Sequence, residues 1–386
     1  MLLRNLYSVN DNERIDIQVS GNKILSVYNQ GEYKSNSSEE IIFEDAIVFP
    51  GLINSHDHLD FNSFPQLGNR VYNNYIEWGD DIHDKDKKII DSVLKIPKPL
   101  RVQWGVYKNL LNGVTTVVNH GAPITIMDEL ITVFQKSHVL HSVQLEKGWK
   151  YKLNKPSFRK WPYVIHVGEG TDTKSSSEID QLIKWNLFKK DIIGIHGVAM
   201  NEQQAAAFEA LIWCPVSNCF LVGKTSPVDQ LKHKTTILFG TDSTVSASWN
   251  IWDHFRVAQQ QKLVSNRELF GMLTSAPSAI WQLPGYGKIA SGCIADIVIA
   301  KGKKDMMGLD AFFAISPEDI LLVMHKGNIR LIDKEIYKQV ERKNTYRNYN
   351  EIYVKDSCKY VQGDLQLLMK QISKFYPDVN FPISYG

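Results

Sequence analysis

Four short apolar runs in the sequence carry a histidine or an aspartate at their carboxyl ends. The runs are residues 52–59, 163–167, 192–198 and 236–241, the last followed directly by Asp242. Each run has the length and composition of a buried strand, and amphipathic stretches separate them. Alternation of buried strands with helices predicts βα units and a parallel sheet. The fold class predicted is therefore α/β, a (β/α)8 TIM-like barrel, in which such strand ends share one face.

Further signals complete this barrel pattern. Asn201 is a good helix N-cap, and Ser265 with Glu268 has capping-box spacing, as has Ser175 with Glu178. Three further strands are expected at residues 114–120, 139–145 and 211–215. Between His58 and His166 there are 107 residues, too few for three units of roughly 30 residues each once residues 60–98 are set aside as an insertion. The fourth unit is therefore expected to be short or missing.

The two ends of the chain have a different pattern, with alternating apolar and polar residues around Gly-Asn turns. One turn is Gly21-Asn22 and the other is Gly327-Asn328. We therefore expect a composite β-sandwich domain from residues 1–50 and 286–334 and a barrel domain over residues 51–285. Residues 335–386 are expected to form a C-terminal extension. Its amphipathic helix would pack on the body or on a second subunit, with an apolar stripe of Leu365, Leu368, Met369 and Ile372.

Composition limits the partners. Hydrophobic residues make up 43% and charged residues 22%, which is typical of globular proteins. The net charge of +2 is far below the basic field that nucleic-acid binding requires. No run approaches the roughly 20 apolar residues that span a bilayer. We expect a small-molecule substrate, no nucleic acid and no membrane partner, a cytoplasmic location, and a homodimer as one possible assembly. The four cysteines show no CxxC pair and are expected to be reduced thiols.

The strand-end residues have the chemistry of metal ligands. His56 and His58 flank Asp57, and period-two alternation turns both imidazoles to one face of the strand and Asp57 to the other. His166 with Glu169, His196 and Asp242 end three other expected strands. Imidazoles and carboxylates are common ligands of divalent metals, so their convergence on one face predicts a shared metal site.

The segments around these residues form a recognisable series. PGLINSHDHL, LLNGVTTVV, IHVGEG, GIHGV, CPVSN, FGTDS and GKIASGCIADIVIAKG resemble, in order, the marker segments of the amidohydrolase superfamily. The resemblance runs from about residue 1 to about residue 335 and is closest to the cytosine, guanine and S-adenosylhomocysteine deaminase branch. It implies a (β/α)8 barrel with a β-sandwich made from both chain ends. It also implies one divalent metal, with zinc expected and Fe²⁺ or Mn²⁺ as alternatives.

The resemblance also implies a role for each residue. The metal ligands are His56, His58, His166 and Asp242. Glu169 and His196 are catalytic, together with Asp242, whose two oxygens divide the work. A metal with an open position lowers the pKa of bound water to about 7, and Glu169 would carry the water proton to the leaving nitrogen. Two-metal members generally use a carboxylated lysine, and Lys147 is the nearest candidate here, although a solvated lysine is the simpler interpretation.

The favoured function is hydrolytic deamination of an amino-substituted heterocycle by a metal-bound hydroxide. Hydrolysis of a cyclic or N-acyl amide is the first alternative, and a metal-free, non-catalytic binding relative is the second. Ser217 and Asn218 resemble a turn that supports the site from behind. The residues expected to contact substrate are His120 and four from the insertion after the first strand, Asn74, Tyr75, Glu77 and Trp78.

Overall fold

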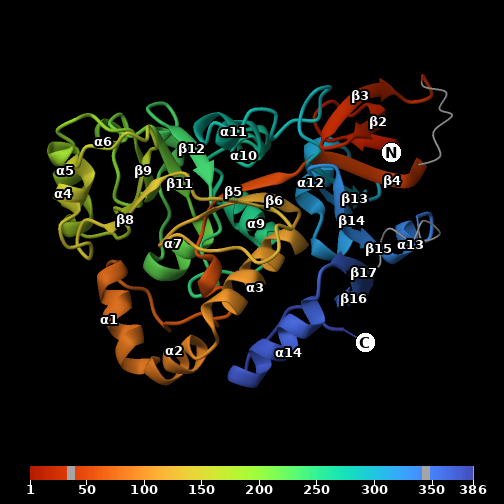
Figure 1. Cartoon of the computed structure of the whole chain (residues 1–386). Helices are drawn as coiled ribbons and strands as arrows, with labels where there is room; N and C mark the ends of the chain where they lie inside the picture. The colour runs from red at the N-terminus through yellow and green to blue at the C-terminus, as the bar shows by residue number, and fades with distance from the viewer. Residues whose placement is uncertain (33–39, 341–347, 386) are drawn as a thin grey trace.

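The computed structural model describes residues 1–32, 40–340 and 348–385. Two parallel sheets lie in the middle of the chain (Figure 1). One has three strands in the order β5-β6-β7, and the other has five in the order β12-β11-β10-β9-β8. Their bounds are β5 Leu52–Asp57, β6 Val114–Asn119, β7 Thr132–Phe134, β8 His138–Ser142, β9 Tyr163–Val167, β10 Ile192–His196, β11 Ala210–Trp213 and β12 Thr236–Phe239.

The two sheets meet at the strands that begin and end the series. The backbone N–H groups of Thr241 and Asp242 both donate to the carbonyl of His56 at 3.1 Å, which joins the end of β12 to β5. Eight parallel strands in chain order, joined at this side, are consistent with a TIM-like barrel. The ends of all the ligand strands are thereby brought to one face.

On the opposite side of the barrel the sequence predicted a short or missing fourth unit, but the unit without a helix is the third, which begins with β7, whereas α4 follows β8 in the fourth. Only residues 135–137 separate β7 from β8, and no helix covers the step. Parallel neighbours normally need a crossover of a dozen or more residues, so β7 and β8 do not pair, and the chain passes directly from the first sheet to the second. The sequence did not predict β7, because its three residues are too few to show a period.

Helices surround the strands. The insertion after β5 contains α1 Tyr75–Lys85 and α2 Lys87–Leu94, and α3 Lys98–Leu111 leads into β6. The other helices up to β13 are α4 Trp149–Asn154, α5 Thr173–Trp185, α6 Glu202–Ala205, α7 Pro215–Val222, α8 Val228–Leu231, α9 Ile251–Gln261, α10 Asn266–Gly271 and α11 Ser275–Ile280, with the 3-10 turn η1 Leu59–Phe61 after β5. Asn201 and Ser265 cap their helices as predicted. The capping box expected at Ser175 is wrong, because Asp172 caps α5 from three residues upstream.

The chain ends meet in one further sheet of nine strands, in the order β16-β17-β15-β14-β13-β4-β1-β2-β3. Its strands are β1 Leu2–Ser8, β2 Arg14–Ser20, β3 Lys23–Asn29, β4 Glu40–Pro50, β13 Ile297–Lys301, β14 Ile320–His325, β15 Asn328–Asp333, β16 Tyr349–Val354 and β17 Ser357–Gln362. Both Gly-Asn turns join antiparallel strands, β2 to β3 and β14 to β15, as predicted.

This sheet differs from the sequence prediction in two respects. The strands hydrogen-bond into a single sheet, because β4 pairs with β1 on one side and with β13 on the other. The sheet also includes β16 and β17, from the residues assigned to the C-terminal extension. Beyond them, α14 Leu365–Phe375 buries the predicted apolar stripe and packs against α3. The remaining short helices are α12 Gly308–Ala314, η2 Pro317–Asp319 and α13 Lys334–Tyr337.

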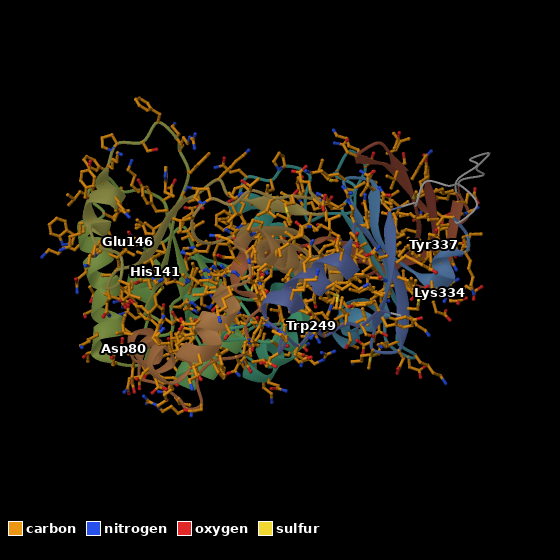
Figure 2. The ribbon with its side chains drawn as sticks, turned by 60° about the horizontal axis from the view of Figure 1, so that its bottom comes forward. Asp80, His141, Glu146, Trp249, Lys334 and Tyr337 are labelled. Carbon is orange, nitrogen blue, oxygen red and sulfur yellow. The ribbon has the colours of Figure 1, made fainter. Side chains whose placement is uncertain are left out.

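Figure 2 shows that Lys334 and Tyr337 of the short helix α13, which follows β15 of the nine-stranded sheet, lie at the opposite end of the molecule from His141 and Glu146. In the part of the chain that the structure describes, no helix is long and apolar enough to cross a membrane.

Candidate metal centre

Four histidines and one aspartate, from the ends of four strands, converge at the carboxyl ends of the parallel sheets. There are two overlapping sets of possible metal ligands, and both include His56. Within each set, the possible ligand atoms all lie within 4.8 Å of one another. The first set adds His58 and His166, and the second adds His196 and Asp242. The structure thus brings together all four ligands that the resemblance implies. It also places His196 among them as a further possible ligand.

The distances within this cluster fit a bound cation. The Nε2 atoms of His58 and His166 lie 3.3 Å apart, and their rings stack in parallel. Asp242 Oδ1 lies 3.6 Å from His56 Nε2 and 3.8 Å from His58 Nε2. His56 Nε2 is buried and has no hydrogen-bond partner. A buried nitrogen without a partner is costly, and three nitrogens with one carboxylate oxygen are a donor set that a divalent metal would satisfy.

The hydrogen bonds behind two imidazoles fix which nitrogen faces the cluster. His166 Nδ1 lies 2.8 Å from the carbonyl of His141, and His196 Nδ1 lies 2.8 Å from the side-chain oxygen of Asn218. Both oxygens can only accept, so each Nδ1 donates and each Nε2 presents a lone pair to the site. Asn218 therefore supports the site from behind, as the CPVSN turn predicts.

Asp242 uses its two oxygens differently. Oδ2 accepts hydrogen bonds from the hydroxyls of Ser217 at 2.8 Å and Ser246 at 2.9 Å, while Oδ1 accepts from the backbone N–H of Ser243 and faces the histidines. Burial alone would raise the pKa of Asp242, but the neighbouring imidazoles of His56, His58 and His196 hold that pKa well below 3.8. Sequence reasoning identified Ser217 and missed Ser246, which lies in no recognised motif.

The backbone at the ends of two ligand strands is strained. His196 has a φ of 72° and Asp242 a φ of 56°, in the left-handed region that residues other than glycine rarely adopt. Such a conformation costs about 1–3 kcal/mol and is found mostly at functional sites. Here it turns the chain sharply at the strand end, so that the side chain of each residue points into the cluster.

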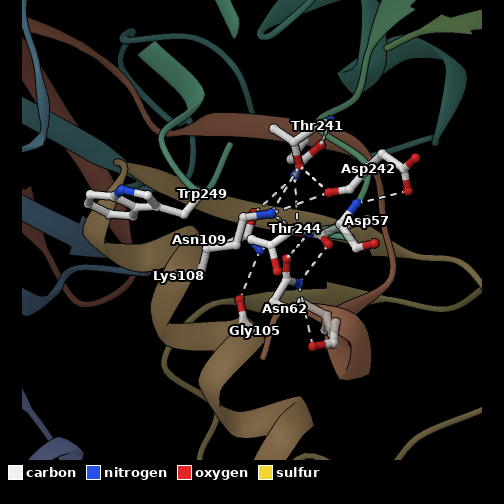
Figure 3. A network of polar contacts seen from close by, with 12 residues as sticks. Asp57, Asn62, Gly105, Lys108, Asn109, Thr241, Asp242, Thr244 and Trp249 are labelled. Atoms are coloured by element: carbon white, nitrogen blue, oxygen red, sulfur yellow. Dashed lines mark hydrogen bonds and ion pairs between the residues drawn. The ribbon is translucent and has the colours of Figure 1, made fainter. Parts of the chain in front are cut away.

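Asp57 faces away from the metal cluster, as period-two alternation predicts, and it anchors a buried polar network (Figure 3). Its Oδ2 accepts from Lys108 Nζ at 3.1 Å and from Asn109 Nδ2 at 2.8 Å, and its Oδ1 accepts from Asn62 Nδ2 at 2.8 Å. Lys108 Nζ also donates to the backbone carbonyl of Asp242 at 3.3 Å. The network therefore ties β5, α3 and the end of β12 together beneath the ligands.

Glu169 lies beside the cluster. Its Oε1 is 3.5 Å from His196 Nε2, and the side chain is buried. Burial raises the pKa of Glu169 well above 4.5, and the nearby carboxylates of Asp242 and Glu178 raise it further. Burial also lowers the pKa of His196 to about 4, so this imidazole is neutral at pH 7.

A second buried glutamate holds the turn that carries Glu169. Glu178 of α5 accepts a hydrogen bond from the backbone N–H of Gly168 at 2.7 Å, and also from Gln144 Nε2 and the hydroxyl of Tyr75. The N–H of Tyr75 donates to the carbonyl of Glu169 at 3.1 Å. Both α5 and the first loop therefore fix the backbone around Glu169.

A cavity of about 850 Å³ opens at the short β7–β8 side of the barrel. Its lining includes the histidines His58, His120 and His141 and the exposed lysines Lys152 and Lys155. His120 is buried, and neither of its nitrogens has a hydrogen-bond partner. Its ring centroid lies 4.5 Å from that of His166 and 5.4 Å from that of His58. The cavity is within the size range of small-molecule sites.

The other residues expected to contact substrate are held mainly by contacts within the first loop. Asn74 caps α1 and its Nδ2 donates to Asp172, while Tyr75 reaches Glu178. Glu77 accepts from Arg70 and Asn73, and Trp78 Nε1 donates to the carbonyl of Leu67. Among the described residues, these four are not part of the cavity wall, so their contact with substrate stays a prediction.

Lys147 is exposed to solvent between β8 and α4. A carboxylated lysine that bridges two metals has to lie between them, among buried ligands. This position agrees with the simpler interpretation that Lys147 is a solvated side chain.

Comparison with known proteins agrees with the fold and the motifs. Residues 163–330 match the model of the Amidohydrolase family. An adenosine deaminase from Xanthomonas campestris, solved with bound zinc, superposes with a TM-score of 0.75 at 13% identity and covers 98% of each chain. An atrazine chlorohydrolase mutant from Arthrobacter aurescens, solved with zinc and atraton, has a TM-score of 0.65 at 16% identity and covers 88% of this chain and 98% of its own.

A third similar structure is N-isopropylammelide isopropylaminohydrolase from Burkholderia multivorans, with a TM-score of 0.60 at 15% identity over 85% of this chain and 97% of its own. No curated protein matches the chain by sequence. At these identities the structural likeness shows the fold, and the family match rests on residues 163–330. The match over residues 163–330 and the shared fold both agree with the resemblance that the motifs indicate.

Proposed function

We propose that the protein hydrolyses a C–N bond other than a peptide bond, with deamination of an amino-substituted heterocycle as its favoured reaction. The observation that carries this proposal is the position of Glu169, a buried carboxyl group 3.5 Å from His196 and next to the ligand cluster. Hydrolysis at a C–N bond needs a group that moves a proton from water to the leaving nitrogen, and Glu169 lies where it can do so.

The residues proposed to hold one divalent metal are His56, His58, His166 and Asp242. Zinc is the metal proposed, because the adenosine deaminase and the atrazine chlorohydrolase were both solved with zinc. A bound metal of this kind lowers the pKa of a water ligand to about 7, so that a nucleophile forms at neutral pH.

The protein's own residues would then move the protons. Glu169 accepts the proton of the attacking water and delivers it to the departing nitrogen, which leaves as a neutral amine. A carboxyl group with a raised pKa holds that proton readily between the two steps. His196 is neutral at pH 7 and presents Nε2 to the site, where it orients the water or substrate.

His120 is the residue proposed to recognise the heterocycle. A neutral imidazole offers one donor and one acceptor, and both nitrogens of His120 lack protein partners in the buried site. One of these nitrogens can hydrogen-bond a ring nitrogen or an amino group of the heterocycle. We retain Asn74, Tyr75, Glu77 and Trp78 as proposed parts of a loop that closes over the ligand, although the polar contacts described above already engage them.

We also propose how the chain divides. Residues 51–285 would form a (β/α) barrel with a shortened third unit, and they carry every residue assigned a role here. Residues 1–50 and 286–334 would form a β domain on which the barrel rests. The C-terminal residues that contribute β16 and β17 extend its sheet.

The test is a substrate screen with metal-loaded protein. Amino-substituted purines, pyrimidines and triazines are assayed for ammonia release, and cyclic or N-acyl amides for acid release. A Glu169→Gln variant with the same metal content is the control for each positive. Ammonia release that the variant lacks supports deamination, whereas acid release from amides alone would replace it with amide hydrolysis. Turnover of neither class by fully loaded protein would count against the proposal.

A further inference from the structure

Two short segments at one end of the molecule carry most of the exposed aromatic side chains. They are residues 145–160, which include α4, and residues 184–191, which begin in the last turn of α5, and we call them together the basic apolar surface (Figures 1 and 2). They contain six of the 16 large apolar side chains that are exposed among the described residues. The six are Leu145, Tyr151, Phe158, Trp185, Leu187 and Phe188. Single exposed apolar residues are ordinary, but a cluster marks an interaction site.

Contacts join the two segments into one surface. Asn154, at the end of α4, donates from Nδ2 to the carbonyl of Trp185 at 2.7 Å, and its Oδ1 accepts from the N–H of Leu187 at 3.1 Å. Lys150 Nζ lies 4.3 Å from the ring centroid of Trp185. Tyr151, Leu187 and Phe188 are 71%, 62% and 64% exposed, so they project outward from this connected framework.

The same segments are strongly basic. They contain nine lysines and arginines but only two acidic residues, a net charge of +7. Because the whole chain has a net charge of +2, the rest of the chain has a net charge of −5. The nine are Lys147, Lys150, Lys152, Lys155, Arg159, Lys160, Lys184, Lys189 and Lys190. Although the overall charge is small, it is unevenly distributed, and the positive end of the molecule also bears the exposed apolar side chains.

The charge and the apolar side chains of the basic apolar surface together indicate which class of partner it binds. A symmetric dimer through this surface would place one +7 patch against its copy, which like-charge repulsion opposes. Nucleic acid would satisfy the lysines and stack on aromatic rings, but Leu145 and Leu187 have no ring face to offer a base. An anionic lipid bilayer satisfies both features, because its phosphates attract lysines and its interface accepts leucine and aromatic side chains.

We propose that the basic apolar surface binds anionic lipid bilayers peripherally. The inference does not depend on the reaction proposed above. It revises the expectation of no membrane partner, which rested on the absence of a spanning segment and on the averaged charge. The cavity that is lined by His58 and His120 is also lined by Lys152 and Lys155, so the bound protein would hold this cavity near the lipid headgroups.

The experiment is co-sedimentation of the full chain with vesicles. One preparation contains phosphatidylcholine alone, and the other contains equal parts of phosphatidylcholine and phosphatidylglycerol. We expect binding to the anionic vesicles only, with at least tenfold weaker binding in 1 M salt, where the screening length falls from about 10 Å at 0.1 M to about 3 Å.

Two double variants test the surface itself. L187S/F188S removes two exposed apolar side chains, and K189Q/K190Q removes two charges; each should weaken vesicle binding at least tenfold. Their matched controls are M306S/M307S, an adjacent exposed apolar pair elsewhere, and K87Q/K88Q, an adjacent exposed lysine pair. Because all eight side chains lie outside the core, unchanged circular dichroism and melting temperature should accompany every variant.

Several results would overturn the proposal. These are no binding to anionic vesicles, equal binding to neutral vesicles, or equal losses in the target and control variants. A dimer that L187S/F188S dissociates in light scattering would assign the surface to self-association instead. Binding of single-stranded oligonucleotides that outcompetes the vesicles would assign it to nucleic acid.

Discussion

Lys108 Nζ lies 3.1 Å from Asp57 Oδ2, and both side chains are almost completely buried. The lysine comes from α3 and the aspartate from the strand that carries His56 and His58. Lys108 also reaches the backbone carbonyl of Asp242. One buried cation thus connects the first two proposed ligands of the metal with the last.

Replacing Lys108 with methionine should destabilise the protein by about 3–5 kcal/mol, because Asp57 would remain as an unpaired buried charge. The measurement is urea unfolding of the metal-free protein. Lys87→Met is the matched control, since Lys87 forms an exposed ion pair with Asp91 that should contribute about 0–1 kcal/mol. An equal decrease in the free energy of unfolding in the two variants would show that the buried Lys108–Asp57 pair contributes no more to stability than an exposed ion pair.

Metal content provides a second test. We expect about one divalent metal per purified chain and a large loss of metal in His166→Ala, whose Nε2 faces His58. Elemental analysis measures both, with exposed His233→Ala as the control. Two metals per chain, with Lys147 carboxylated, would contradict the proposed single site.

The Glu169→Gln variant should keep its metal and lose turnover by about 10²- to 10⁴-fold, because an amide keeps the shape of the side chain but cannot accept the proton. Steady-state kinetics on the substrate found in the screen, together with metal analysis of the same sample, provide the measurement. Near-normal turnover would remove Glu169 from the proton-transfer role.

Glu178 should act through the position of Glu169. Glu178→Ala removes the acceptor for the backbone N–H of Gly168, so kcat should fall while KM changes little. Glu178→Gln keeps an acceptor oxygen and should recover part of kcat. A rise in KM alone in the alanine variant would instead indicate a substrate contact.

Acid should destabilise the protein through His254, which lies outside the ligand cluster. Burial lowers the pKa of His254 to about 4, against 6.5 for an exposed histidine. Between those values only the unfolded chain binds the proton, so the free energy of unfolding falls as pH falls from 6.5 towards 4. His254→Gln should flatten this slope in urea titrations of metal-free protein, whereas exposed His233→Gln should leave it unchanged.

The ligand cluster could be predicted from sequence because its determinants are local. Each proposed ligand ends a short apolar run, and parallel strands bring such ends together whatever the loops contain. Helix caps at Asn201 and Ser265 could be predicted for the same reason. The support from Lys108 and Ser246 could not, since it depends on how α3 and the segment after β12 pack beneath the site.

The misses have physical causes. A three-residue strand such as β7 has no measurable period, and the pairing of β17 with β15 joins residues whose separation no local pattern encodes. The basic apolar surface was hidden by averaging, because a net charge of +2 sums a positive end and a negative remainder. The net charge of one surface can be calculated only when the structure shows which segments of the chain form that surface.

The direct step from β7 to β8 leaves a seam in the barrel wall. These strands are the last members of their respective sheets, so each presents one edge of backbone amides without a ladder partner among the described strands. In hydrogen–deuterium exchange, amides along the seam should therefore exchange faster than those of β10 and β11, which have neighbours on both sides. The wall would open there first, on the flank where the cavity lined by His58 and His120 lies.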